Sequence, residues 1–81
     1  MSTDKKHRAA ELRHMLEVAQ LAIPKEREAR ALYLKAAAKA PGETARLLFE
    51  HLANEEQRHE AKLQAIIKEL REQLEELLQE K

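Results

Sequence analysis

The chain has 81 residues, of which 37% are charged, with fifteen Lys and Arg against fifteen Asp and Glu. The balanced charge gives no net field for nucleic acid or an anionic membrane, and no apolar run is long enough to span a bilayer. Because cysteine is absent, disulfides and thiolate metal sites are excluded, and only oxygen and imidazole ligands remain. The N-terminus lacks the apolar segment of a secretion signal, so we predict a soluble cytoplasmic protein.

The predicted elements are two helices and one turn. A first helix is expected over about residues 4–40, a turn over about 41–43 and a second helix over about 44–80, because strong helix formers flank the only Pro-Gly pair. Pro24 removes a hydrogen bond to the carbonyl of Gln20 and predicts a kink or interruption of the first helix. Residues 1–81 therefore form a single all-α domain, an antiparallel two-helix hairpin.

An apolar stripe runs along each predicted helix, and ionisable residues interrupt both stripes. In the first helix the stripe consists of Leu12, Met15, Ala19, Ala22, Glu26, Ala29, Tyr33 and Ala36. It is widened by Leu16, Ile23 and Ala37. In the second helix the stripe consists of Phe49, Leu52, Glu56, His59, Leu63, Ile66, Leu70 and Leu77, and it is flanked by Leu48, Ile67, Leu74 and Leu78. Glu26, Glu56 and His59 thus stand at positions where a core residue is expected.

The hairpin places these three residues at one level. Glu26 lies fifteen residues before Pro41 and Glu56 fifteen after it, roughly 22 Å along each helix at about 1.5 Å per residue. His59 follows Glu56 by less than one turn, so both side chains project from one helix face. Burying a carboxylate is costly unless it is paired, so the convergence favours a cation between the three groups.

Other interpretations of these residues stay open. Glu26, Glu56 and His59 would also fit a buried ionic network, with Arg30 or Gln73 as a partner, in a metal-free oligomeric helical adaptor. A structural zinc site is a third interpretation. The nearest acidic neighbours of these positions, Glu28 and Glu55, lie off the stripes, and we interpret them as solvated groups or as groups that contact the ligands from outside. His7, His14 and His51 also lie off the stripes, and we interpret them as surface residues. His51 and Glu55, four residues apart, form a weak additional candidate site.

Two helices cannot cover both apolar stripes, so the folded unit is expected to be a homodimer or a multiple of it. Two hairpins form a four-helix bundle and double the ligands to four glutamates and two histidines. This set matches the di-iron pattern of one Glu from each of two helices and Glu-x-x-His from each of the other two. Iron suits such ligands best, and manganese and zinc remain open.

At these residues the chain resembles the ferritin-like superfamily, most nearly proteins of the rubrerythrin and erythrin type. The resemblance covers about residues 12–70 and is carried by KEREARALY (residues 25–33), the Pro-Gly turn and LLFEHLANEEQRHEAKL (residues 47–63). It implies that Glu26, Glu56 and His59 are metal ligands and that Tyr33 is the tyrosine beside them. An ordinary core position near Phe49 is the alternative for Tyr33.

The half-length layout is similar to the encapsulated ferritins, whose hairpins dimerise around a shared iron centre. That similarity implies an encapsulin shell as a candidate partner and its interior as a candidate location. Rubrerythrins usually deliver electrons through a cysteine-containing rubredoxin module, and this sequence has no cysteine, which argues against a rubredoxin-coupled peroxidase. The predicted activity is therefore that of a di-iron ferroxidase, in which Glu26, Glu56 and His59 form the catalytic centre that oxidises Fe(II) to Fe(III) with oxygen or peroxide, in iron storage or detoxification.

Overall fold

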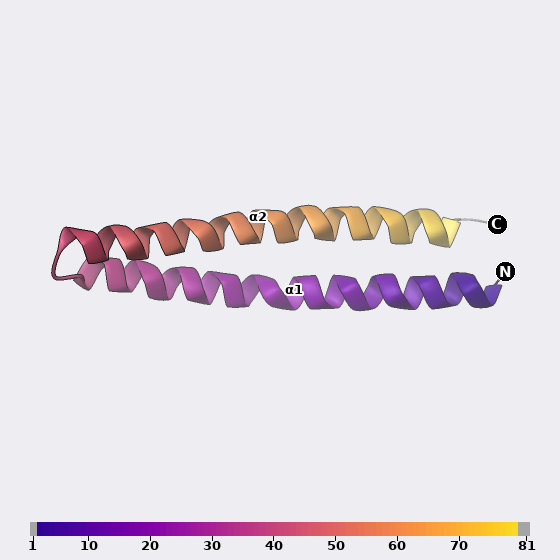
Figure 1. Ribbon diagram of the computed structural model, residues 1–81. Helices are drawn as coiled ribbons and strands as arrows, with labels where there is room; N and C mark the ends of the chain where they lie inside the picture. Colours follow the sequence, from indigo (N-terminus) through magenta and orange to yellow (C-terminus); the bar gives the residue numbers. More distant parts are fainter. Residues whose placement is uncertain (1, 80–81) are drawn as a thin grey trace.

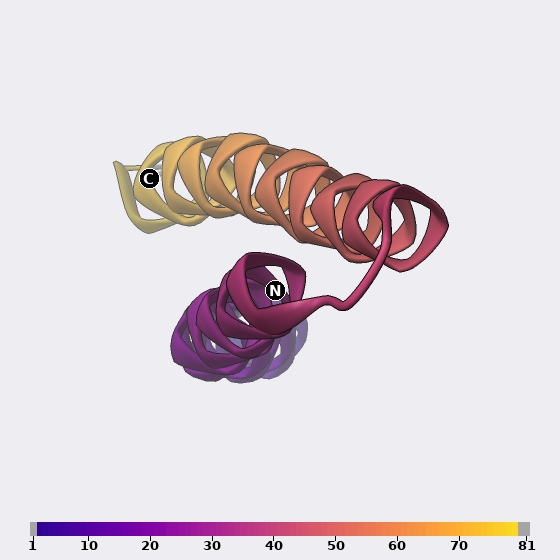
Figure 2. The same cartoon turned by 90° about the vertical axis from the view of Figure 1, so that its left-hand side faces the viewer.

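The computed structural model describes residues 2–79 and consists of two long helices, α1 (Ser2–Lys39) and α2 (Glu43–Gln79). The helices run antiparallel and side by side, so the start of α1 and the end of α2 lie at the same end of the molecule (Figures 1 and 2). Together they form a rod of 62 × 14 × 12 Å. The all-α antiparallel hairpin predicted from the sequence is confirmed.

The connection between the helices is short and occupies residues 40–42. Pro41 disfavours a helical conformation at Ala40, so α1 ends at Lys39. The amide of Ala40 still donates to the carbonyl of Ala37 at 3.2 Å, and the amide of Arg46 donates to the carbonyl of Gly42 at 3.1 Å. This second bond closes the first turn of α2, and the short connection leaves the two helices in register as direct neighbours.

The interruption of the first helix that Pro24 predicts does not occur. Helix α1 continues through Pro24 to Lys39. Pro24 and Gln20 are both exposed, so water can hydrate the carbonyl that lost its helical partner, and the proline ring displaces no core side chain. Glu26 is therefore presented by a continuous helix.

The core of the hairpin lies between the halves of the two helices that are farther from the turn. Leu16, Ala19 and Ile23 of α1 pack against Ile67 and Leu70 of α2, and three partly buried leucines complete this cluster: Leu12, Leu63 and Leu74. Nearer the turn the contact uses smaller residues, including buried Ala37 and Ala53. The candidate metal ligands lie between these two regions, so packing on both sides fixes the helices at their level.

Within one hairpin, the contact between the helices does not follow the centres of the predicted stripes. Met15 is 53% exposed and Ile66 is 48% exposed, whereas Ile23 and Ile67, which we expected at the margins, are buried. The apolar face of each helix is wider than one partner helix can cover. The hairpin therefore buries one side of each apolar face and leaves the other side exposed at the edge of the contact between the helices. His59, expected in the core, also lies at this edge and is exposed.

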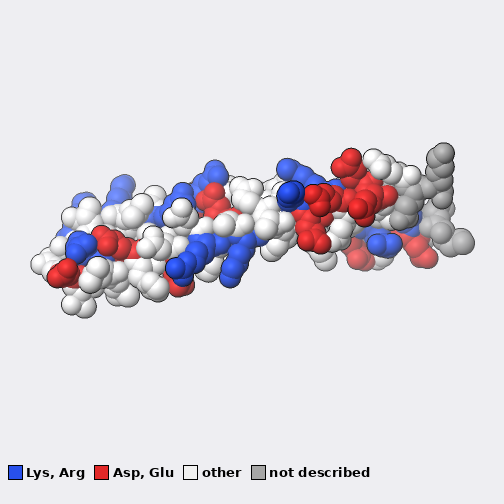
Figure 3. All heavy atoms as spheres, turned by 90° about the horizontal axis from the view of Figure 1, so that it is seen from above, with Lys and Arg blue, Asp and Glu red and all other residues white. Residues whose placement is uncertain are grey.

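Much of the remaining surface is charged, and the described residues also expose apolar side chains, among them Met15, Leu48 and Ile66. From above, Lys, Arg, Asp and Glu side chains lie along the whole length of the rod, and acidic groups gather towards its free end (Figure 3). Within residues 2–79, neither helix contains a stretch long and apolar enough to cross a membrane.

Candidate metal centre

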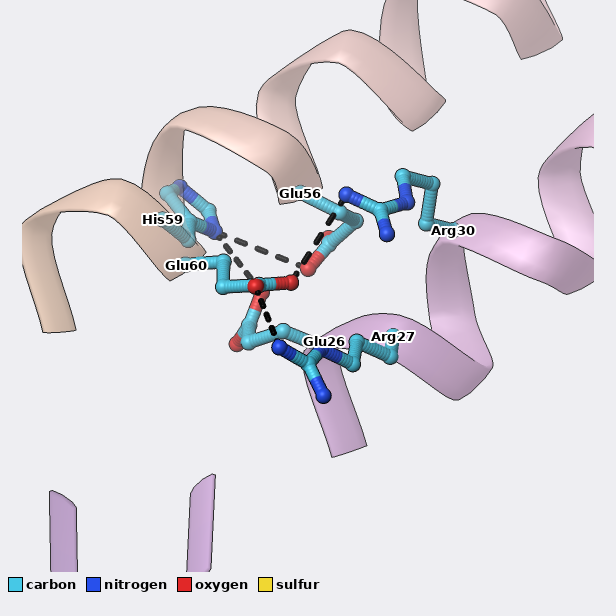
Figure 4. A network of polar contacts seen from close by, with 6 residues as sticks. All are labelled: Glu26, Arg27, Arg30, Glu56, His59 and Glu60. Atoms are coloured by element: carbon cyan, nitrogen blue, oxygen red, sulfur yellow. Dashed lines mark hydrogen bonds and ion pairs between the residues drawn. The ribbon is translucent and has the colours of Figure 1, made fainter. Parts of the chain in front are cut away.

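Three side chains converge midway along the hairpin, Glu26 from α1 and Glu56 and His59 from α2 (Figure 4). Each offers one ligand atom, and these atoms lie within 4.8 Å of one another. His59 Nδ1 is 3.2 Å from Glu26 Oε2 and 3.6 Å from Glu56 Oε2. The structure thus brings together the three residues that the sequence predicts as ligands.

The local helix geometry explains this convergence. Glu56 and His59 are three residues apart and therefore project from neighbouring positions on one face of α2. Ile23, one turn before Glu26, and Leu63, one turn after His59, belong to the core cluster. Because this packing fixes the rotation of both helices, Glu26 is directed across the interface towards the other two groups.

The cluster is covered on one side and open on the other. The side chains of Glu26 and Glu56 are 24% and 17% exposed, whereas His59 is 49% exposed. The carboxylates are therefore held mostly within the interface, and the imidazole lies at the hairpin edge. Three donors and an open side are an incomplete coordination sphere that additional ligands could complete.

Glu26 destabilises the charged form of Glu56. The pKa of Glu56 is raised, first by a hydrogen bond that it can share with Glu26, and further by desolvation and by the negative charge of Glu26. His59 acts in the opposite direction but does not reverse the shift. A divalent cation in this position would relieve the repulsion between the carboxylates.

A second ionic group lies beside the cluster, and sequence reasoning did not find it. Arg27 Nη2 donates to Glu60 Oε2 at 2.9 Å, and Arg30 Nη1 lies 3.6 Å from Glu60 Oε1. The hydrogen bond from Arg27 is the main reason that the pKa of Glu60 is lowered; partial burial opposes this effect. One feature of the sequence could have indicated this pair. Arg27 and Glu60 are separated by 33 residues, the same separation as Glu26 and His59, so both pairs lie at the same level of the hairpin.

The other residues singled out from the sequence lie outside the cluster. Tyr33 is two turns from Glu26, about 10 Å along α1, and its ring stacks on Phe49 with centroids 6.4 Å apart. Glu28 is exposed. His51 Nε2 lies 3.2 Å from Glu55 Oε1, and the exposed pair of His7 and Glu11 has the same spacing at 2.8 Å. Such i,i+4 pairs recur on this surface, so the contact of His51 with Glu55 does not by itself indicate a metal site.

The repulsion between the carboxylates predicts that removing one of them will not weaken the metal-free fold. In chelator near neutral pH, Glu56→Gln is expected to melt at the same temperature as the parent or up to about 5 °C higher. A raised folded-state pKa means that the folded parent binds more protons than the unfolded chain, so its stability rises as the pH falls towards the ordinary value of 4.5. The advantage of Glu56→Gln should therefore shrink on acidification.

Circular dichroism melts at several pH values, with Glu55→Gln as the control, test this expectation. If Glu56→Gln melts well below the parent in chelator, then Glu56 stabilises the fold through a structural ionic network. The inference that repulsion between Glu26 and Glu56 dominates in the metal-free protein would then be wrong.

The hairpin and its cluster define a class of protein, the ferritin-like helical proteins in which Glu and Glu-x-x-His side chains of neighbouring helices can hold metal. The chain matches the rubrerythrin family over residues 17–81, which include all of α2 and most of α1. The protein therefore belongs to the rubrerythrin family, and the resemblance stated from the sequence is confirmed. Comparison with curated proteins and with solved structures finds no match.

Proposed function

We propose that two copies of this chain form a ferroxidase that binds a pair of iron ions and oxidises Fe(II) to Fe(III) with oxygen or peroxide. The observation that carries the proposal is the convergence of two carboxylates and one imidazole within 4.8 Å. Hard oxygen donors combined with imidazole suit iron, and membership of the rubrerythrin family supports the same choice.

The need for a second chain follows from the open side of the cluster. Leu48 and Ile66 lie eleven residues before and seven residues after His59, so they share its face of α2, and both are about half exposed. Met15 lies eleven residues before Glu26 and is similarly exposed. A second hairpin packed on this edge would bury these side chains and face its own cluster towards the first.

The residues then have distinct roles. Glu26 and Glu56, of which Glu56 is the less exposed, would hold iron through carboxylate oxygens, and His59 would hold it through its imidazole. Bound iron would supply the one-electron chemistry of the reaction. The two carboxylates of each chain would neutralise the metal charge, and His59 Nδ1 already faces them. The apolar core cluster shields the site on one side, and the second hairpin would cover the open side.

We predict that iron and assembly are coupled. Native mass spectrometry with Fe(II) should detect a dimer or a multiple of it that contains two metal ions per two chains, because only the paired hairpins complete the ligand set. Analytical ultracentrifugation at micromolar concentration provides an independent measure of the assembly.

The same experiment separates the alternatives. A chain that stays monomeric with iron added would contradict the di-iron proposal. Assembly that is unchanged by iron or chelator, with no bound metal, would favour the helical adaptor. Stoichiometric zinc that supports no iron oxidation would favour a structural zinc site.

A further inference from the structure

In the ionic group beside the cluster, one carboxylate pairs with two arginines. Glu60 accepts a hydrogen bond from Arg27 at 2.9 Å and lies 3.6 Å from Arg30 (Figure 4). Its side chain is only 17% exposed. Its Oε1 atom is buried and accepts no hydrogen bond, so its contact there with Arg30 is electrostatic. Glu60 is thus the shared counter-ion of both arginines.

Both arginines have the proposed metal ligands as alternative partners. Arg30 follows Glu26 by four residues, the spacing at which opposite charges meet on a helix surface, whereas Arg27 directly follows Glu26, does not face it, and has Glu56 as its alternative partner. On α2, Glu56 precedes Glu60 by the same four residues, so a guanidinium that reaches Glu60 is about one turn from Glu56. An arginine and a carboxylate form strong, often bidentate pairs.

We propose that Glu60 is a positioning residue that holds both arginines away from the two ligand carboxylates and so keeps those carboxylates available to a divalent cation. This inference rests on the proposed metal-binding function of the cluster. Arginine is charged at every relevant pH, so a guanidinium released from Glu60 would compete with the cation under all working conditions. The repulsion between Glu26 and Glu56 would make them attractive partners for it.

The first test compares the affinity for Co²⁺, followed by absorbance titration, of the parent and of Glu60→Gln. Loss of the shared counter-ion is expected to weaken binding about tenfold or more, the usual scale for groups that orient metal ligands. Glu28→Gln is the matched control because it removes the same charge from an exposed position two residues after Glu26. Its affinity should stay within about twofold of the parent.

The second test separates competition by the arginines from loss of a tie between the helices. Adding Arg27→Gln and Arg30→Gln to Glu60→Gln removes the competitors, so affinity should return to at least the parent value. The control adds Lys25→Gln and Arg58→Gln instead, which remove the same charge from exposed positions, one of them in a groove on the other side of α2. This control should remain weak.

Each outcome has a defined meaning. If the parent binds Co²⁺ and Glu60→Gln binds it equally well, the inference is wrong and the proposed function stands. If the triple variant stays as weak as Glu60→Gln, Glu60 is only a structural tie and the inference is wrong. A parent that binds no Co²⁺ or Fe(II) overturns both proposals. Should Glu60→Gln fail to fold, the double variant Arg27→Gln with Arg30→Gln decides, because it must bind Co²⁺ at least as tightly as the parent.

Discussion

Replacing Glu26 or Glu56 by alanine is expected to reduce Fe(II) oxidation by about a hundredfold or more, because each change removes two of the four carboxylates from the proposed dimer. Both side chains lie at the centre of the cluster, on opposite helices. The rate can be followed by the absorbance of Fe(III) after mixing anaerobic Fe(II)-loaded protein with oxygen or peroxide.

The controls for these variants are their neighbours. Glu28→Ala and Glu55→Ala remove the same charge close to the same positions but leave the cluster intact, so both should retain most of the parent rate. Parent-like oxidation by Glu56→Ala would exclude the proposed centre. Equal losses in all four variants would indicate a general electrostatic attraction of iron instead of ligation at specific residues.

The affinity for Fe(II) or Co²⁺ is expected to fall about tenfold to a hundredfold between about pH 7.5 and about pH 5.5, because protons compete with the metal for the proposed ligands. Glu56 contributes to this fall, since its pKa is raised by the carboxyl of Glu26 and it takes up a proton at higher pH than an isolated glutamate. His59 contributes because only the neutral imidazole binds a metal. Titration at a series of pH values under anaerobic conditions measures the effect.

His51 is the control for the role of His59. Its imidazole contacts Glu55 at the i,i+4 spacing that also joins the exposed pair of His7 and Glu11. His51→Gln should bind metal with the parent affinity and the parent pH profile. A pH profile that disappears in His51→Gln would move the metal site to the pair of His51 and Glu55. An affinity that does not change with pH in the parent would exclude His59 as a ligand.

Several features of this protein could be predicted from residue order alone. The single Pro-Gly pair between two runs of helix formers determines a hairpin, and equal distances from that turn place Glu26 level with Glu56. The i,i+3 spacing of Glu56 and His59 places both on one face, whatever the partner. These predictions succeeded because they depend only on helical rise, helical periodicity and the position of one turn.

The same reasoning does not determine how each helix is rotated about its axis within the hairpin. The apolar faces are wide enough to pack in more than one way, and packing selected Ile23 and Ile67 for the centre while Met15 and Ile66 stayed at the edge. Continuity through Pro24 was likewise decided by solvent exposure, which the local hydrogen-bond argument does not contain.

Only the tertiary structure decided how the ionisable side chains are partnered. From the sequence alone, Arg30 could pair with Glu26, which lies four residues away on the same helix. In the folded hairpin Arg27 and Arg30 contact Glu60 across the interface, and Glu26 is left facing His59. The sequence determines which charges share a level of the hairpin, but the rotation of two packed helices selects which of them meet. Contacts between charged groups change steeply over a few ångströms, so a rotation of one residue position exchanges one set of partners for another.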